Sequence, residues 1–413
     1  MKLHQTAHII STYSADNFGV CSALFELGGM VVMHDPSGCN STYTTHDEPR
    51  WYNQDSLIFI SALTEQDAVL GRDDKFISDI VSSAQQFKPA FICIIPSQIA
   101  FLIGTDMKAL AKIITQKTGI TCFTLPTNSM HYYPRGIYYA LDFLADEASK
   151  KTLPIPKTKS TKPVVNLLGV TPLDFSVNGA VSSLIDWLTN AGFTLGACWA
   201  MTSDLATIEQ SVTADINLVV TYGGLGAARR LNKAFGTPFV IGTPLGPLQK
   251  IVVDNLKASL MDKKNRLAYR GVGGEVFNDT PEMMTAGTID NPNYANNQLA
   301  ANNLLIGESI YALSLARALE LSTGLHQQVI VPVETERQLL LSDTLQLTDE
   351  TDLMPLFAKA QRIIGDPMYK PIVPANTQFI DLPHEGFSGR LYSKQIPNLI
   401  VPANFSDFSQ RCK

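Results

Sequence analysis

The 413-residue sequence predicts an α/β fold with mostly parallel sheets, and two observations indicate this fold class. Short runs of β-branched residues alternate with longer amphipathic segments, an order typical of parallel sheets with helices on both faces. The chain is also too long for one ordinary hydrophobic core. The length predicts two or three domains, and we expect three Rossmann-like domains, which span residues 1–155, 163–260 and 261–413.

The first domain is expected to alternate buried strands with amphipathic helices. Apolar residues between Phe76 and Val81 recur at a spacing of three to four, and Gly119 ends a second helical segment. An acidic loop is expected between the second strand and the first of these helices. The predicted strands are 29–34, 56–61, 90–96 and 120–126, and the predicted helices are 71–87 and 106–119.

A segment rich in Lys, Thr and Pro at 150–163 marks the boundary with the second domain. Beyond about residue 260 the alternation is less regular, and the polar stretch 278–298 is expected to be loop-rich. The predicted strands after the linker are 164–170, 216–222, 238–244, 326–334, 376–383 and 397–403, and the predicted helices are 178–193, 226–236 and 302–324.

Composition and charge exclude several classes of protein. The net charge of −6 and the pI near 5.7 argue against a nucleic-acid binder, which needs a basic face. The sequence contains no run of about 18 apolar residues, which a membrane-spanning helix would need, so no membrane association is expected. The N-terminal segment lacks the features of a signal peptide, and a cytoplasmic location is therefore expected.

The six cysteines are scattered along the chain, and no two of them form a C-x-x-C pair. Their spacing does not match a zinc finger, and a cytoplasmic protein seldom keeps structural disulfides. Each cysteine is therefore either a packing residue or a ligand that meets others only in the fold. They are Cys21, Cys39, Cys93, Cys122, Cys198 and Cys412.

The stretch at 19–43 is the most informative part of the sequence. An apolar strand runs into His34-Asp35-Pro36-Ser37-Gly38-Cys39, where Pro36 and Gly38 favour a turn. Cys39 is thus expected at the carboxyl end of a strand, where open parallel sheets bind ligands. Exposed backbone N–H groups of such a turn could hydrogen-bond the sulfurs of a cluster. The alternative interpretation is a buried cysteine at a tight turn.

Several segments together resemble the nitrogenase component 1 family, in the family's own order. The H-D-P-S-G-C turn is similar to the family's H-G-P-x-G-C turn, which carries a cluster cysteine. The other similar segments are the acidic strand–loop–helix at 61–76, the P-S-Q-I-A-F-L-I-G-T-D stretch at 96–106, the second-domain block at 218–247 and L-P-H-E-G-F-S-G-R-L-Y at 382–392.

The resemblance implies an iron–sulfur cluster, of the [4Fe–4S] type, at a subunit interface. Cys39 matches the second of the family's three cluster cysteines. The first would fall near Ser14 and the third at Gln98, and neither position holds cysteine. Cys21 is the nearest thiol to the first position, and its alternative role is that of a small buried hydrophobe. Because a [4Fe–4S] cluster takes about four ligands, the partner must supply the rest.

The partner implied by the resemblance is a homologous component 1 subunit, which is either identical or a sister chain. In a homodimer, Cys21 and Cys39 of each chain would give four thiolates. In a heterodimer, the partner would give three and Cys39 the fourth. His34 and Asp35 are candidates for substitute ligands or for neighbours that hydrogen-bond the cluster.

The resemblance also implies a substrate pocket and an electron donor. The family's cofactor cysteine in the second domain falls at Ala227 or Ala228, so a covalently bound iron–molybdenum-type cofactor is not expected. Arg229 could bind an acidic substrate and His384 could donate protons, although a solvated helix face and an ordinary loop histidine are the alternatives.

The expected activity is that of a nitrogenase-like oxidoreductase subunit. It would receive electrons from an ATP-dependent iron-protein reductase and reduce a small-molecule substrate. The missing cysteines keep open a second hypothesis, a non-catalytic scaffold or carrier for metal-cofactor assembly. A metal-free α/β ligand-binding protein is a third.

Overall fold

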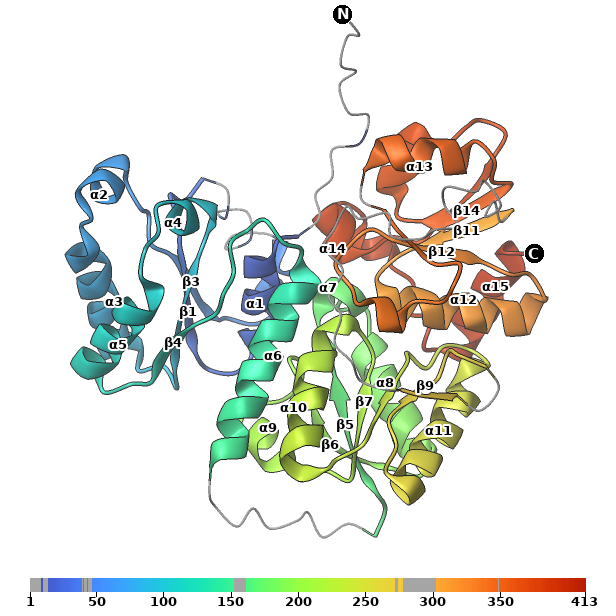
Figure 1. The fold of residues 1–413 in the computed structure, drawn as a ribbon, viewed down its shortest axis with the longest axis horizontal. Coiled ribbons are helices and arrows are strands. Elements are labelled where there is room, and N and C mark those ends of the chain that lie inside the picture. The colour runs from blue at the N-terminus through green and yellow to red at the C-terminus, as the bar shows by residue number, and fades with distance from the viewer. Residues whose placement is uncertain are drawn as a thin grey trace, which may run out of the picture.

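The computed structural model describes residues 9, 14–38, 40, 43, 47–151, 161–271, 274–277, 302–347 and 349–413. Within these residues the chain forms three separate sheets, each covered by helices (Figure 1). The predicted fold class, three α/β units with mostly parallel sheets, is therefore confirmed. The predicted linker and the polar stretch at 278–298 lie largely outside the described residues.

The first sheet has four parallel strands in the order β2-β1-β3-β4. Side chains of β1 alternate between two cores, because successive residues of a strand point to opposite faces. Met30 and Val32 pack with α3 and α5, and Val31 and Met33 pack with α1 and α6. The strands are β1 (Met30–His34), β2 (Leu57–Ile60), β3 (Ile92–Pro96) and β4 (Cys122–Thr124), and the helices are α1 (Asp16–Leu24), α2 (Glu65–Leu70), α3 (Asp73–Phe87), α4 (Gln98–Leu102), α5 (Met107–Thr118) and α6 (Tyr133–Lys150).

The second sheet has six strands in the order β10-β9-β8-β7-β5-β6, and only β10 is antiparallel. It extends beyond the predicted boundary at 260, because β9 pairs with β8 and β10 pairs with β9. The strands are β5 (Val164–Leu168), β6 (Thr194–Cys198), β7 (Ile216–Val219), β8 (Phe239–Ile241), β9 (Arg266–Leu267) and β10 (Glu275–Val276), and the helices are α7 (Pro172–Phe175), α8 (Ala180–Asn190), α9 (Leu205–Ser211), α10 (Leu225–Phe235) and α11 (Leu248–Asp262).

The third sheet has five parallel strands in the order β13-β12-β11-β14-β15. Two predictions were wrong here. The segment 302–324 is not one helix, since its first residues form the central strand β11, and 397–403 is no strand, since Pro402 begins α15. The strands are β11 (Asn303–Ile306), β12 (Gln328–Val331), β13 (Leu345–Gln346), β14 (Arg362–Gly365) and β15 (Gln378–Asp381), and the helices are α12 (Ser309–Thr323), α13 (Glu350–Phe357), α14 (Glu385–Ser388) and α15 (Pro402–Arg411).

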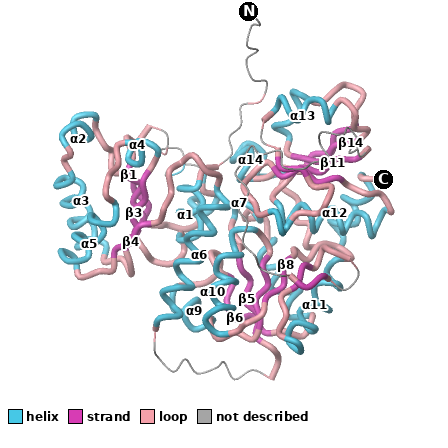
Figure 2. The backbone as a smooth tube through the Cα atoms, viewed as in Figure 1, coloured by secondary structure: helices cyan, strands magenta, loops and turns pink. Residues whose placement is uncertain are grey.

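Helix α6 joins the first domain to the second. It lies between α1 and α10, and Figure 2 shows it running along the seam between the two units. The close approach to α1 depends on two glycines, because a Cβ atom at Gly19 or Gly136 would overlap the backbone of the other helix. Among the described helices, none combines the length and the apolar character that a membrane crossing needs.

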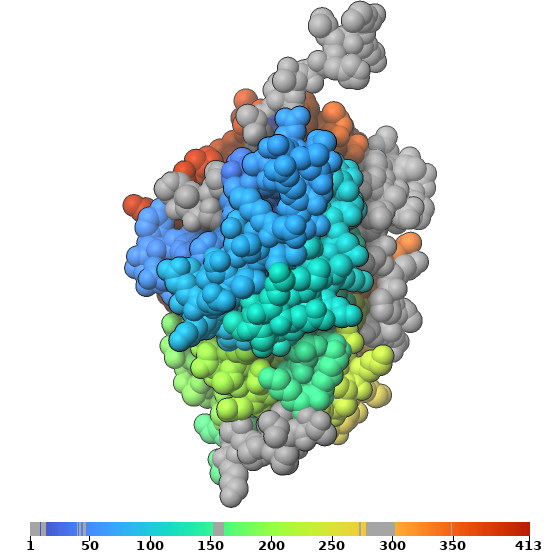
Figure 3. Space-filling view, turned by 90° about the vertical axis from the view of Figure 1, so that its left-hand side faces the viewer, coloured from blue at the N-terminus to red at the C-terminus, as the bar shows by residue number. Residues whose placement is uncertain are grey.

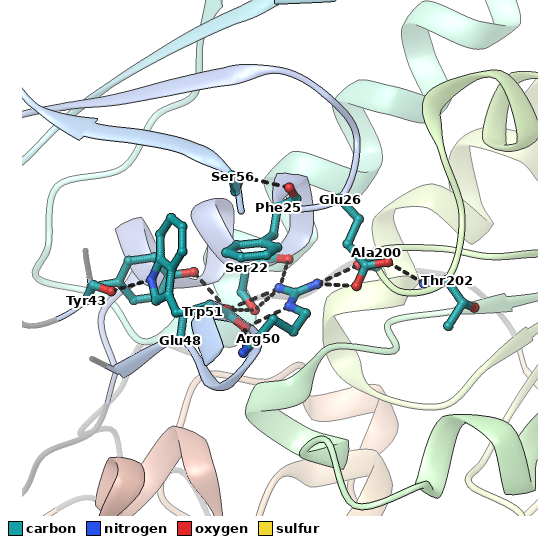
Figure 4. A network of polar contacts seen from close by, with 10 residues as sticks. All are labelled: Ser22, Phe25, Glu26, Tyr43, Glu48, Arg50, Trp51, Ser56, Ala200 and Thr202. Carbon is teal, nitrogen blue, oxygen red and sulfur yellow. Dashed lines mark hydrogen bonds and ion pairs between the residues drawn. The ribbon is translucent and has the colours of Figure 1, made fainter. Parts of the chain in front are cut away.

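A buried arginine makes a second joint between the same two domains (Figure 4). The Arg50 guanidinium donates to Glu48 at 2.7 Å, to Glu26 at 2.9 Å and to the carbonyl oxygen of Ala200, in the second domain, at 3.0 Å. Glu26 in turn accepts from the Thr202 backbone N–H at 2.6 Å. Arg50 and Glu48 are both buried, so each charge has lost its contacts with water. The ion pair between them replaces those contacts.

We expect Arg50→Gln to lower the free energy of unfolding by about 3–5 kcal/mol, because it leaves the buried Glu48 carboxylate without its cation. Urea unfolding at neutral pH measures the change. Lys75→Gln is the control: it removes an exposed ion pair with Asp79 and should cost less than about 0.5 kcal/mol. Equal, small losses in the two variants would show that the joint contributes little to stability.

Candidate functional site

The carboxyl edge of the first sheet carries the turn on which the sequence analysis depends. Strands β1 and β3 finish level with each other, since His34 pairs with Pro96, and β2 finishes beside them with Ile60 opposite Met33. The chain leaves β1 through His34 and Asp35 and then turns, with Ser37 in the left-handed region at φ 66°. The structure thus brings His34 and Asp35 to this edge, whereas Cys39 lies outside the described residues.

His34 is held in its neutral form. Its Nδ1 lies 2.9 Å from Ser61 Oγ, and its ring lies 4.3 Å from the ring of Phe76. Burial lowers the pKa of His34 to about 4, because a charged imidazole would lose its hydration. The Ser97 hydroxyl donates to the carbonyl oxygen of His34 at 2.9 Å and so joins the ends of β1 and β3. These contacts suit His34 to positioning the turn.

Asp35 is buried beside it and is only partly satisfied. Its backbone N–H donates to Ser61 Oγ at 3.2 Å, and its carbonyl oxygen accepts from the Leu63 N–H at 2.9 Å. Its side-chain Oδ2 is buried and has no hydrogen-bond partner among the described residues. A buried carboxylate oxygen without a donor is costly, so this atom is the one at the edge that an additional ligand would satisfy.

Cys21 lies away from this edge, within the core. It is fully buried on α1, near Cys93 of β3, and burial followed by the nearby Glu48 carboxylate raises the pKa of its thiol. This environment favours the packing role over the thiolate that a cluster needs. Within the described residues no three His, Cys, Asp or Glu side chains are grouped as a metal site.

Two short helices beside the same edge expose apolar side chains. Helix α2 follows β2 and exposes Val69 (77%) and Leu70, and α4 follows β3 and exposes Phe101 and Leu102 (64%). Both helices belong to the outer part of the first domain, which forms the blue to cyan surface in Figure 3. Apolar residues concentrated beside a strand edge are typical of a protein interface.

His384 lies at a second site, where the three domains meet. Its Nε2 is 3.3 Å from Asp174 Oδ1 of the second domain, and neither ring nitrogen makes a hydrogen bond to any residue that the structure describes. Asp174 also accepts from the Tyr133 hydroxyl of the first domain at 2.6 Å. The His384 backbone is fixed by Asp366, which accepts from its N–H at 2.8 Å. One carboxylate, that of Asp174, thus contacts side chains from both other domains.

Glu308 completes this junction from the third domain. Its carboxylate accepts from the backbone N–H groups of Tyr222, in the second domain, and Tyr311, each at 2.9 Å. Burial and the nearby Asp174 charge raise the pKa of Glu308 to about 7. Asp174, Glu308 and His384 line a cavity of about 20 Å³, which has room for roughly one water molecule.

Arg229 does not line this cavity and already has an anionic partner. It donates from both Nη atoms to the Glu336 carboxylate, at 2.7 and 2.6 Å. The hypothesis that Arg229 and His384 face one acidic substrate is therefore not supported by this geometry. Sequence analysis overlooked Asp174, Glu308 and Glu336. Glu308 could have been found as an acid just after a strand, since it follows β11, whereas Asp174 lies in α7, the first helix after β5.

Comparison with known proteins bears on both sites. The family model for nitrogenase component 1 type oxidoreductases matches residues 18–251, more than half of the chain. The chain belongs to this family. The matched region includes the His34–Asp35 turn and α10, and it ends before the third sheet.

Individual relatives are distant. One subunit of the light-independent protochlorophyllide reductase of Prosthecochloris aestuarii is 25% identical over 229 residues, which are 55% of this chain and 42% of that protein. The nitrogenase iron-molybdenum cofactor biosynthesis protein NifE of Methanosarcina barkeri is 27% identical over 229 residues, 51% of this chain and 46% of that protein. The chain thus matches less than half the length of these curated relatives.

The likeness in fold extends further than the likeness in sequence. A structure of nitrogenase Cp1 at pH 5 superposes with a TM-score of 0.66, at 13% identity, over 99% of this chain and 89% of that one. A second, at pH 6.5, gives the same score at 14% identity, over 99% and 94% of the two chains. At such low identity these structures support the three-domain fold alone.

We expect stability to fall as pH rises from about 4.5 to about 7 partly because of Glu308. Over that interval the folded state keeps a proton that the unfolded state has released, so a rise in pH favours unfolding. Glu308→Gln has no such proton. Its free energy of unfolding should therefore fall by on the order of 1–3 kcal/mol less than that of the wild type over the same pH interval.

Urea unfolding at pH 5 and pH 7 tests this expectation. Glu147→Gln is a control, because Glu147 is an exposed partner of Lys150 and should leave the pH dependence unchanged. The same pH dependence in wild type and Glu308→Gln would contradict the expectation.

Proposed function

We propose that this chain is one subunit of a nitrogenase-like component 1 reductase. A separate ATP-dependent iron protein would supply low-potential electrons, an iron–sulfur cluster would receive them, and a small-molecule substrate would be reduced. The observation that carries the proposal is the carboxyl edge of the first sheet, where Asp35 Oδ2 is buried with no partner among the described residues, just before the turn that leads to Cys39. Family membership supports the reaction class.

The residues at this edge fit a cluster only if a second subunit completes it. Cys39 and the Asp35 carboxylate are the two ligands that we assign to this chain, and His34 would hold the turn in place. A [4Fe–4S] cluster takes about four ligands, so a homologous subunit would supply the others. Such a cluster, when bound, stores and passes single electrons. We leave Cys21 out of the ligand set because of its burial in the core.

The exposed apolar helices support the same arrangement. A cluster between two chains must be shielded from water, since hydrogen bonds to its sulfurs and solvent access set its reduction potential. Helices α2 and α4 stand beside the turn, and their apolar side chains would be covered by the partner. His384 is the candidate proton donor, because its Nε2 lies 3.3 Å from Asp174 and neither ring nitrogen makes a hydrogen bond to the described chain.

A second function has one specific observation in its favour. One relative, at 27% identity, is named as a protein of iron-molybdenum cofactor biosynthesis rather than as a reductase. A scaffold or carrier would bind a metal cluster but would pass it on. It would therefore lose its metal to an acceptor protein without turning over a substrate, and following the iron with an isotope label distinguishes the two functions.

We expect Cys39→Ala to remove about four iron atoms per cluster from the complex with its homologous partner, purified without oxygen. Iron analysis and electron paramagnetic resonance of the reduced complex measure the loss. Cys122→Ala is the matched control, because this thiol lies in a strand of the first sheet and packs in its core. Full iron content in Cys39→Ala would refute the proposed cluster site.

We expect Leu102→Asp to weaken assembly with the homologous partner at least tenfold, because it introduces a charge into an apolar contact. Analytical ultracentrifugation of the mixed subunits gives the dissociation constant. Met261→Asp is the control, since Met261 is 85% exposed on α11 of the second domain. Equal dissociation constants for wild type and Leu102→Asp would place the interface elsewhere.

A further inference from the structure

A large cavity lies between the second and third domains. Its volume is about 600 Å³, within the range of small-molecule sites. One wall is the segment just after β9 with Glu275 of β10, and the other is α12 with the turn that follows it and residues 340–342. In Figure 1 these elements lie on the side of the molecule away from the first domain. No residue of the His34–Asp35 turn or of the His384 junction lines it.

The wall from the second domain carries a fixed cation. Arg270 Nη2 donates to the carbonyl oxygens of Gln338 at 2.8 Å and Leu340 at 2.7 Å, and these bonds hold the guanidinium in one orientation. Its Nη1 lies 3.3 Å from Glu275, whose side chain is 61% exposed. An ion pair this solvated is weak, so another anion could take the place of Glu275.

The wall from the third domain is rich in acceptors. Glu320 uses Oε2 to accept from Arg317 at 2.5 Å, while its Oε1 lies 3.8 Å from His326, beyond hydrogen-bond distance. Next to it, Gln327 is almost completely buried, and its Oε1 has no hydrogen-bond partner in the described part of the chain. Gln327 Oε1 and Glu320 Oε1 could each accept a hydrogen bond, and a cationic group could donate to both atoms.

Both walls hold buried polar atoms without a partner in the described chain: a donor on the second-domain wall, and a donor and an acceptor on the third-domain wall. Within the residues that the structure describes, Arg270 and Arg317 each have a buried Nε without a partner, and Gln327 has a buried oxygen without one. Bulk water does not reach these atoms. Leaving a buried donor or acceptor unpaired is costly. A bound molecule with an acceptor at one end and a donor at the other would therefore pair with more of these groups than a molecule with only one kind.

We propose that this cavity binds a small zwitterion of the amino-acid type. Its carboxylate would lie against the Arg270 guanidinium, in exchange for Glu275, and its ammonium group would donate to Glu320 and Gln327. Binding would join the second domain to the third. The proposal is independent of the cluster, because it uses none of the residues at the edge of the first sheet.

Isothermal titration calorimetry with three linear probes tests the charge pattern. The probes are 6-aminohexanoate, which has one charge of each sign, succinate, which has two negative charges, and putrescine, which has two positive charges. We expect 6-aminohexanoate to bind at least tenfold more tightly than the other two. Arg270→Gln should weaken its binding at least tenfold. Arg230→Gln, at an arginine that pairs with Asp142 outside the cavity, should not.

Two results would overturn the proposal. One is that no probe binds, and the other is that succinate or putrescine binds as tightly as 6-aminohexanoate. If Arg270→Gln fails to fold, as judged by circular dichroism, Glu320→Gln replaces it, because that side chain is partly exposed and its loss leaves the Arg270 contacts intact. An unchanged affinity in Glu320→Gln would then refute the assigned ammonium site.

Discussion

The strand ends of the second and third sheets meet in the interior, and this arrangement requires acceptors that reach across domain boundaries. Backbone N–H groups just beyond a strand have no partner in the sheet, and burying them unpaired is costly. Carboxylates supply the partners here. Glu308 accepts from the Tyr222 N–H, Glu334 from the Tyr132 N–H at the start of α6, and Asp366 from the His384 N–H. The first two of these contacts join different domains.

The same requirement explains the perturbed acids and the small cavity at the junction. Each carboxylate must be buried to reach its donor, and burial raises the pKa values of Glu308 and Asp366. The side chains that satisfy one another also fill the space between the sheets, where only about 20 Å³ is left beside His384. A junction filled in this way joins the domains and leaves room for about one water molecule.

Much of the fold could be predicted because its strongest features are local. The apolar runs that form β1, β3 and β5 and the spaced apolar residues of α3 are visible in the sequence alone. The central strand β11 was missed because its four residues adjoin a long helix, and only a short turn at Gly307 separates the two. The continuation of the second sheet beyond residue 260 could not be seen in the sequence, because the two-residue strands β9 and β10 have no periodicity to detect.

The sites were harder to predict because they depend on partners that are distant in sequence. The position of Asp35 at the end of β1 followed from its own segment, but the pairing of Arg229 with Glu336 joins residues more than 100 positions apart. Cys21 shows the same limit. Its place in an apolar helical run was evident, whereas its burial near Cys93 depends on how α1 packs against the first sheet.

The first sheet differs from the other two in what covers its strand ends. Ser61 and Ser97 satisfy the backbone around His34, yet Asp35 Oδ2 finds no donor in the described chain and the adjoining helices leave apolar side chains in water. In the second and third sheets another domain of the same chain supplies the missing contacts. No such domain covers this edge within the described residues. The unpaired carboxylate oxygen and the exposed apolar side chains lie close together, so one external surface could cover both, and this is why we propose assembly through this edge.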